Sequence, residues 1–116
     1  MHLIIAYIRP ERLNDVKQAL VQRQILKISV TNALGCGDEQ SYHEKYRGAD
    51  VEVDLTPRVR LEIAVNEAYV AKTIEGIVEG GRTGEDGRGS DGKIFVLALE
   101  DCVRISTGAR GDDAIG

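Results

Sequence analysis

The sequence predicts an α+β fold in which four strands and two helices follow one another in the order β-α-β-β-α-β. Three patterns support this order. A short apolar run opens the chain, two later segments repeat apolar residues at helical spacing, and residues 51–63 alternate strictly between apolar and polar side chains. An antiparallel sheet with both helices on one face is the ferredoxin-like split β-α-β arrangement. The second face of the sheet stays open. Because the first and third strands carry more apolar residues than one buried face requires, we expect an oligomer that covers the open face.

The first half of the chain predicts a strand, a helix and a second strand. Residues 3–8 are nearly all apolar and end before Pro10, which suits a central strand followed by the first turn of a helix. Apolar residues then recur at helical spacing over residues 11–23 and predict an amphipathic helix. Residues 25–34 are rich in Ile, Val and Thr and predict the second strand.

The middle of the chain predicts a long polar loop, a strand and a second helix. Residues 38–50 are polar and without period, and loops of this length are usually functional. The alternation over residues 51–63 predicts a half-buried strand. We expect the second helix to begin at Asn66 as its N-cap and to end at Gly80-Gly81 as C-cap residues. Its predicted apolar stripe consists of Val70, Ile74, Ile77 and Val78.

The segment from Gly80 to Lys93 holds six of the 13 glycines of the chain. Successive backbone amides in glycine-rich turns form concavities that suit phosphate, and Lys93 would add a positive charge. The spacing fits neither the Walker pattern nor the dinucleotide-binding glycine pattern, and a solvated hairpin loop is the alternative interpretation. Residues 93–99 then predict a strand, residues 102–105 a short last strand, and residues 107–113 a polar tail.

Composition excludes several classes of function. A net charge of −4 argues against nonspecific nucleic-acid binding, which depends on Lys and Arg. No apolar run is long enough to span a membrane and the start lacks the features of a signal peptide, so we expect a cytoplasmic protein without direct membrane insertion. Cys36 and Cys102 form neither a disulfide framework nor a metal-binding spacing, and we expect no metal site.

Several short stretches match one family in order and spacing over essentially the whole chain. They are Thr31, Gly35-Cys36-Gly37, Tyr46–Asp50, Pro57–Glu62, Thr83-Gly84, Asp91–Val96, Arg104–Gly108 and Asp112–Ile115. With these residues the chain resembles the PII signal-transduction proteins, which regulate nitrogen and carbon metabolism, as a divergent member of that family.

The resemblance implies a single PII-like domain over residues 1–116 that assembles as a homotrimer. It implies a T-loop at about 37–55 that docks onto target proteins, a B-loop at about 81–93 and a C-loop at about 104–116. Adenine nucleotides (ADP, AMP or ATP, the last with Mg²⁺) would bind between subunits, against the B-loop of one and the C-loop of its neighbour. The implied nucleotide-binding residues are Ser29, Gly37, Asp38, Ala64, Gly87, Gly89, Ser90, Asp91, Gly92, Lys93, Arg104 and Ser106.

The chain departs from the family pattern at four places. Val51 stands where many bacterial members have a uridylylated tyrosine, so we do not expect control by uridylylation. Glu39 replaces a glutamine that helps to hold 2-oxoglutarate and would repel that dicarboxylate, unless a shift of the loop brings in Gln40. Arg58 replaces a lysine that pairs with the same ligand. The glycine-rich segment is about three residues longer than usual, and Ser106 replaces a C-loop arginine. The loss of this positive charge should weaken the binding of ATP more than that of ADP or AMP.

The resulting hypothesis is a conformational switch without catalysis. Adenine nucleotide, together with a small carbon-metabolite anion, would select among T-loop conformations, and the loop would control a target transporter or metabolic enzyme. Bicarbonate and 2-oxoglutarate are the two candidate effectors. The candidate effector-binding residues are Gly35, Cys36, Glu39, Gln40 and Arg58, and the candidate partner contacts in the T-loop are Tyr42, Tyr46 and Arg47.

Other functions remain as alternatives. One is a conventional sensor of 2-oxoglutarate and ATP that lacks uridylylation. Another is slow nucleotide phosphohydrolysis at the same cleft, for which Asp91 and Glu62 are the only candidate carboxylates. A third is a purely structural trimeric module, which would leave the glycine-rich segment and Arg104 without a purpose. No nucleophile and base stand at a catalytic spacing, so we expect no enzyme.

Overall fold

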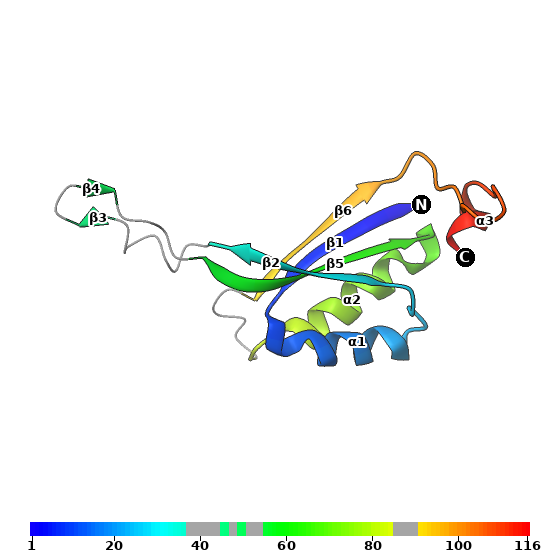
Figure 1. Cartoon of the computed structure of the whole chain (residues 1–116). Coiled ribbons are helices and arrows are strands. Elements are labelled where there is room, and N and C mark those ends of the chain that lie inside the picture. Colours follow the sequence, from blue (N-terminus) through cyan, green and yellow to red (C-terminus); the bar gives the residue numbers. More distant parts are fainter. Residues whose placement is uncertain (37–44, 47–48, 51–54, 85–90) are drawn as a thin grey trace.

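The computed structural model of the chain describes residues 1–36, 45–46, 49–50, 55–84 and 91–116 (Figure 1). Short 3₁₀ turns, Pro10–Arg12 and Glu67–Tyr69, precede the first two helices. The strands are β1 (His2–Ile8), β2 (Ser29–Gly35), β3 (Lys45–Tyr46), β4 (Ala49–Asp50), β5 (Thr56–Val65) and β6 (Gly92–Ala98). The helices are α1 (Leu13–Gln22), α2 (Val70–Gly81) and α3 (Asp112–Ile115).

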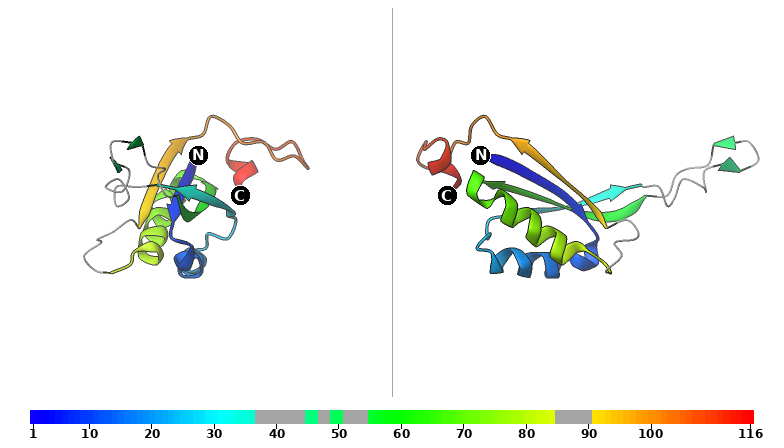
Figure 2. Two further views of the ribbon diagram at one scale, coloured as in Figure 1. Left: turned by 60° about the vertical axis from the view of Figure 1, so that its left-hand side comes forward. Right: turned by 180° about the vertical axis from the view of Figure 1, so that it is seen from behind.

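Four strands form one antiparallel sheet in the order β2-β5-β1-β6. Helices α1 and α2 lie side by side on one face of this sheet, as the views from front and behind both show (Figures 1 and 2). The predicted ferredoxin-like fold is therefore confirmed. The small second sheet pairs β3 with β4, so residues 45–46 and 49–50 of the predicted polar loop form two short antiparallel strands.

The core lies between the sheet and the two helices. Every second residue of β1 and β5 faces the helices, which confirms the predicted alternation after Pro57. The side chains that meet there are Ile4, Ala6, Ile8, Val59, Leu61, Ile63 and Val65 from the strands, with Val16, Leu20 and Ile77 from the helices. This aliphatic cluster holds the helices against the sheet and fixes the edges from which the loops emerge.

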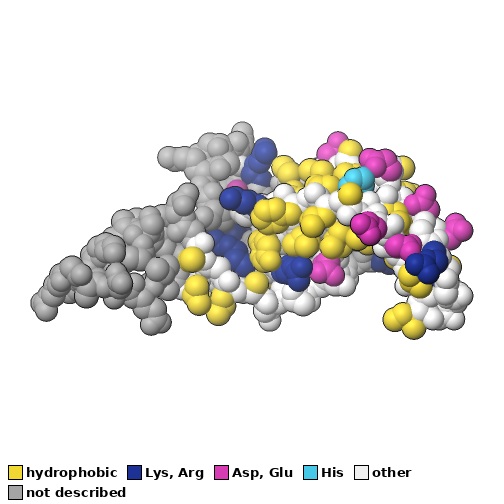
Figure 3. Space-filling view, turned by 90° about the horizontal axis from the view of Figure 1, so that it is seen from above, with side chains coloured by type: hydrophobic (Ala, Val, Ile, Leu, Met, Phe, Trp, Pro, Cys, Tyr) yellow, Lys and Arg dark blue, Asp and Glu magenta, His cyan; other side chains and the backbone are white. Residues whose placement is uncertain are grey.

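The opposite sheet face is open and apolar. Leu3 pairs with Leu97 and Ile5 with Phe95 on this face, and Phe95 and Leu97 are almost half exposed. Apolar side chains gather over this surface in the view from above (Figure 3). An exposed patch of this kind fits the predicted oligomer, because burying it would remove a large apolar area from water.

The two ends of α2 differ from the prediction. Asn66 stands at the N-cap of the preceding 3₁₀ turn but makes no capping hydrogen bond with its side chain. Gly80 and Gly81 were predicted as C-cap residues, and this was wrong because both are buried inside the helix. A Cβ on Gly80 would lie 2.5 Å from the Cα of Val16, so this glycine serves the close approach of α2 to α1.

The predicted apolar stripe of α2 is only partly internal. Ile77 is buried and Val70 packs against the core, but Val78 is exposed. The other buried positions of the helix are the small residues Thr73, Gly76, Gly80 and Gly81. At Gly76 and Gly80 α1 approaches too closely for a Cβ.

Two further predictions are corrected at the strand ends and in the C-terminal segment. The second strand begins at Ser29, and residues 25–28 belong to the connection between α1 and this strand. Residues 102–105 form no regular strand; only Val103 bridges to Arg110. The predicted polar tail provides this bridge and then leads into α3. Residues 51–54 lie outside the described residues, and β5 begins at Thr56.

No helix in the described ranges is both long and apolar enough to cross a membrane.

Candidate functional site

Gly92 opens β6 in a conformation that only glycine can adopt there. Its φ is +114°, and it pairs with Ile8 at the end of β1. A Cβ at this position would lie 1.7 Å from the carbonyl oxygen of Tyr7. The glycine therefore permits direct contact between the start of β6 and β1, in addition to the backbone freedom expected of the glycine-rich segment.

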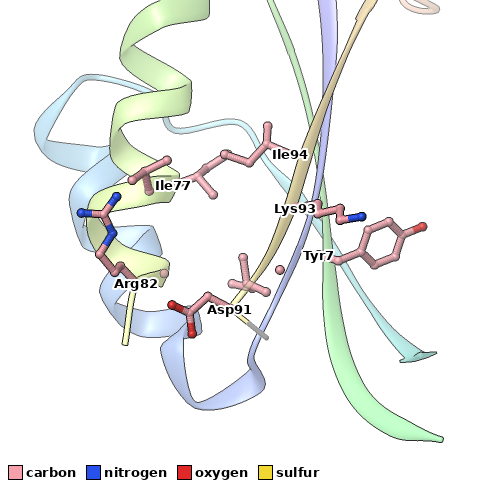
Figure 4. Close-up of a pocket in the computed structure, with 10 residues that line it drawn as sticks. Tyr7, Ile77, Arg82, Asp91, Lys93 and Ile94 are labelled. Atoms are coloured by element: carbon pink, nitrogen blue, oxygen red, sulfur yellow. The ribbon is translucent and has the colours of Figure 1, made fainter. Parts of the chain in front are cut away.

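Lys93 lies on the open face of the sheet beside Tyr7, its partner across the strands (Figure 4). The Tyr7 ring in turn packs edge-on against Phe95, with ring centroids 6.3 Å apart and an interplanar angle of 81°. The side chain of Lys93 is exposed and makes no hydrogen bond or ion pair to any residue that the structure describes. Its ammonium group is therefore available to an anion at this end of the sheet.

Further positive charge lies across the same end of the open face. Arg60 faces Tyr7 from β5 and pairs with Glu62 of its own strand, with 3.1 Å between Nη2 and Oε2. Arg58 lies two residues before Arg60, on the same face of β5, and donates a hydrogen bond to the carbonyl oxygen of Pro57. The three cationic side chains of Arg58, Arg60 and Lys93 make this end of the sheet suitable for phosphate or carboxylate.

The side chain of Asp91 is hydrogen-bonded to other residues of the same chain. Its carboxylate accepts hydrogen bonds from the backbone N–H of Thr83 (3.0 Å), the hydroxyl of Thr83 (2.5 Å) and Nε of Arg9 (3.2 Å). Desolvation by burial raises the pKa of Asp91, but the hydrogen bonds from Thr83 and Arg9 outweigh it and leave the pKa below its ordinary value. The ionised carboxylate thus joins three chain segments rather than pointing at solvent.

A hollow of about 230 Å³ opens between the end of α2 and β6 (Figure 4). Its lining includes the apolar residues Ile8, Ile77 and Ile94 and the charged residues Arg82 and Asp91. Lys93 contributes to its wall, but its side chain points with Tyr7 to the other side of β6 (Figure 4). The ammonium group of Lys93 therefore lies outside this hollow (Figure 4).

The remaining described residues of the predicted nucleotide site lie toward the other end of the sheet. Ser29 and Ala64 line a second hollow, of about 310 Å³, together with Glu62, Lys27 and Ala114. Here the C-terminal segment folds back, and Nη2 of Arg104 donates to the carbonyl oxygens of Ala114 (3.1 Å) and Gly116 (3.3 Å). Ser106 is exposed in the turn that follows Arg104. Arg104 is thus held by α3, close to the second hollow.

The described effector residues come together at the base of the predicted T-loop. A Cβ on Gly35 would lie 3.8 Å from Cγ of Arg58, and Cys36 follows as an exposed residue. Tyr46 lies in β3. The other predicted site residues lie outside the described residues: Gly37, Asp38, Glu39, Gln40, Tyr42, Arg47, Gly87, Gly89 and Ser90.

The sequence did not reveal Tyr7 and Arg9 as parts of this region, and although Thr83 lies in the predicted B-loop, its hydrogen bonds to Asp91 were not predicted. The strand register would have placed Tyr7 beside Lys93 once β1 and β6 were paired. Arg9 had no such signal, because its partner Asp91 is 82 residues away. Among the described residues no cluster of three or more His, Cys, Asp and Glu side chains could hold a metal ion.

Comparison with known proteins identifies the family. The family model described as "Nitrogen regulatory protein P-II" matches residues 1–109. The chain is 47% identical over 115 residues to "Nitrogen regulatory protein P-II 1" of Methanothermobacter thermautotrophicus, covering 99% of this chain and 97% of that protein. It is 44% identical over 115 residues to "Nitrogen regulatory protein P-II" of Rhodospirillum rubrum, covering 99% of this chain and all of that protein.

Family membership settles the class of function. Proteins of this family are non-catalytic signal transducers, form trimers that bind target proteins, and typically bind adenine nucleotides. The hydrolase alternative is therefore set aside; in addition, both of its candidate carboxylates, on Asp91 and Glu62, are paired with arginines. With a matched family model over nearly its whole length and relatives above 40% identity, the chain belongs to the P-II family of nitrogen regulatory signalling proteins.

Proposed function

We propose that the protein is a homotrimer that binds adenine nucleotides in the clefts between protomers and uses them to set the conformation of its T-loop. The observation that carries this proposal is the division of the predicted site. Gly92 and Lys93 lie at one end of the sheet, whereas Ala64 lies toward the other end and Arg104 belongs to the C-terminal segment there.

The strand register supports a site that two protomers complete together. Lys93 pairs with Tyr7 of β1, and Ala64 pairs with Leu3 of the same strand. Four residues of a strand span about 13 Å, and Arg104 lies beyond the strand end. A neighbouring protomer that brings its C-terminal end against Lys93 would supply the missing half. The open apolar face, with Phe95 and Leu97, favours such an assembly.

The phosphate end of the proposed cleft is made by Lys93, the backbone at Gly92 and the arginines of β5. Lys93 supplies a point charge, and Arg104 of a neighbour would add a guanidinium that can bind phosphate oxygens in pairs. Because Ser106 provides no charge where the family has an arginine, we expect ADP or AMP to bind more tightly than ATP with Mg²⁺.

The proposed effector is a small carbon-metabolite anion that binds near Arg58 and Gly35. Bicarbonate and 2-oxoglutarate both carry the negative charge that Arg58 would pair with. The predicted T-loop, residues 37–55, would then change its conformation and bind or release a transporter or metabolic enzyme. A conventional sensor of 2-oxoglutarate and ATP is the second candidate function, supported by the nitrogen-regulatory relatives.

Calorimetric titration with ADP, AMP and ATP, each repeated with bicarbonate or with 2-oxoglutarate and Mg²⁺, tests the proposal. We expect saturable binding of ADP or AMP and a shift in their affinity with bicarbonate. If 2-oxoglutarate instead strengthens ATP binding, the argument from Glu39 and Arg58 is wrong and the second candidate function holds. If no adenine nucleotide binds, the proposal fails.

A further inference from the structure

Three segments of the chain meet where β6 begins. They are joined by hydrogen bonds among Arg9, Thr83 and Asp91, and these three residues are called here the Asp91 cluster. Arg9 comes from the connection between β1 and α1, Thr83 follows α2, and Asp91 directly precedes β6. We infer that the Asp91 cluster positions Gly92 and Lys93 for the nucleotide phosphates, and that Arg9 is a positioning residue that acts through Asp91. This inference rests on the proposed function.

The cluster keeps a carboxylate away from the proposed phosphate site. In a regular strand, residues 91 and 93 would point to the same side. The positive φ of Gly92 interrupts that alternation, and Asp91 and Lys93 point to different sides of β6 (Figure 4). A carboxylate beside Lys93 would repel phosphate, so the orientation of Asp91 favours anion binding at Lys93.

The hydrogen bonds of the cluster also join two positions within the glycine-rich segment. Thr83 and Asp91 are held together by two hydrogen bonds, and Arg9 ties both to the end of β1. The Asp91 side chain is only 19% exposed. Since Gly92 and Lys93 are then already ordered before a ligand arrives, less conformational entropy is lost on binding.

The guanidinium of Arg9 lies near carboxylates of its own protomer. Its Nε lies 3.2 Å from Oδ1 of Asp91, and its Nη1 lies 4.0 Å from Oε2 of Glu11. The guanidinium is therefore paired with Asp91, whereas the side chain of Lys93 has no partner in the part of the chain that the structure describes. This contrast assigns the direct phosphate contact to Lys93 and an indirect role to Arg9.

A double-mutant cycle on ADP affinity separates an indirect role from a direct one. The variants are Arg9→Met, which keeps an aliphatic side chain but removes the charge, Asp91→Asn, and the two combined. We expect Arg9→Met and Asp91→Asn each to weaken ADP binding about tenfold, and the double variant to bind no more weakly than either single variant.

The matched control is Arg23→Met. Arg23 forms a comparable pair with a carboxylate, Glu79, but joins α1 to α2 away from the proposed site. This variant should lower thermal stability to a similar extent as Arg9→Met while leaving ADP affinity unchanged. Arg9→Lys should restore part of the lost affinity, because it restores a charge-assisted hydrogen bond.

The outcomes distinguish the inference from the proposed function. If the unmodified protein binds ADP and Arg9→Met does so equally well, the inference is overturned and the proposed function stands. If the effects of Arg9→Met and Asp91→Asn add fully, Arg9 acts independently of Asp91, and the inference is overturned in the same way. If the unmodified protein binds no adenine nucleotide, both fail.

Discussion

At the scale of single residues, Gly92 carries a strict structural requirement. Its positive φ and its contact with the carbonyl oxygen of Tyr7 both exclude a side chain. The same residue separates the directions of Asp91 and Lys93, so it links the packing of β6 on β1 to the charge arrangement of the proposed site. One backbone conformation thus serves both stability and the site.

Substitution Gly92→Ala should destabilise the fold by roughly 3 kcal/mol, because backbone strain and a collision with Tyr7 act together. Gly108 is the matched control: its φ is +73°, but no atom lies within 4 Å of a Cβ built there. We expect Gly108→Ala to cost only about 1 kcal/mol. Urea denaturation measures both values. Equal losses for the two variants would show that the contact with Tyr7 is unimportant.

At the scale of elements, the pairing of α1 with α2 depends on small residues in α2. A Cβ on Gly76 would lie 2.9 Å from Cδ2 of Leu20, and one on Gly80 would lie 2.5 Å from Cα of Val16. Two arginines of the α1 region strengthen the contact: Arg12 donates to the carbonyl oxygen of Gly80 at 2.8 Å, and Arg23 pairs with Glu79. The close approach keeps the end of α2, and with it Thr83, next to β6.

Neighbouring glycines of α2 should therefore respond in opposite ways to alanine. Gly80→Ala gains about 1 kcal/mol in helix propensity but must push α1 away, and we expect a net loss of about 2 kcal/mol. Gly81→Ala meets only ordinary contacts at 3.8 Å and should stabilise by about 0.5 kcal/mol or more. Thermal denaturation of both variants tests this. Stabilisation by Gly80→Ala would contradict the packing argument.

At the scale of the whole molecule, the sheet divides the protein into a packed side and an open side. The helices cover one face, and the other presents apolar side chains of β1 and β6 to solvent (Figure 3). The protein belongs to a family that forms trimers, and we propose that assembly covers this face. A charge introduced there should act on association and not on the core.

Substitution Leu97→Glu should convert the oligomer to monomers, because an unpaired carboxylate would be buried in an apolar interface. The control Val21→Glu places the same charge at another exposed apolar residue, in α1 and away from the open face. It should leave the oligomer intact. Light scattering after size-exclusion chromatography reports both masses. An unchanged mass for Leu97→Glu would exclude the open face as the interface.

The sequence was sufficient for the elements whose signal is local. The alternation after Pro57 and the apolar spacing around Val16 predicted β5 and α1, because each pattern depends only on neighbouring residues. The role of Gly80 was mispredicted, since glycine suits both a helix end and a close helix contact, and only the position of α1 distinguishes the two. The partners of Asp91 were not predictable, because Arg9 lies 82 residues away in the sequence.

The most direct test of the central claim, a nucleotide site shared between two protomers, is ADP binding by mixed trimers. Protomers with Lys93→Ala and protomers with Arg104→Ala are co-expressed with different tags, and trimers carrying both are purified. Each variant alone should bind ADP weakly, whereas every mixed trimer contains one cleft with both residues intact and should regain high-affinity binding. If mixed trimers bind ADP no better than the two single-variant trimers, the site is not shared between protomers and the account is wrong.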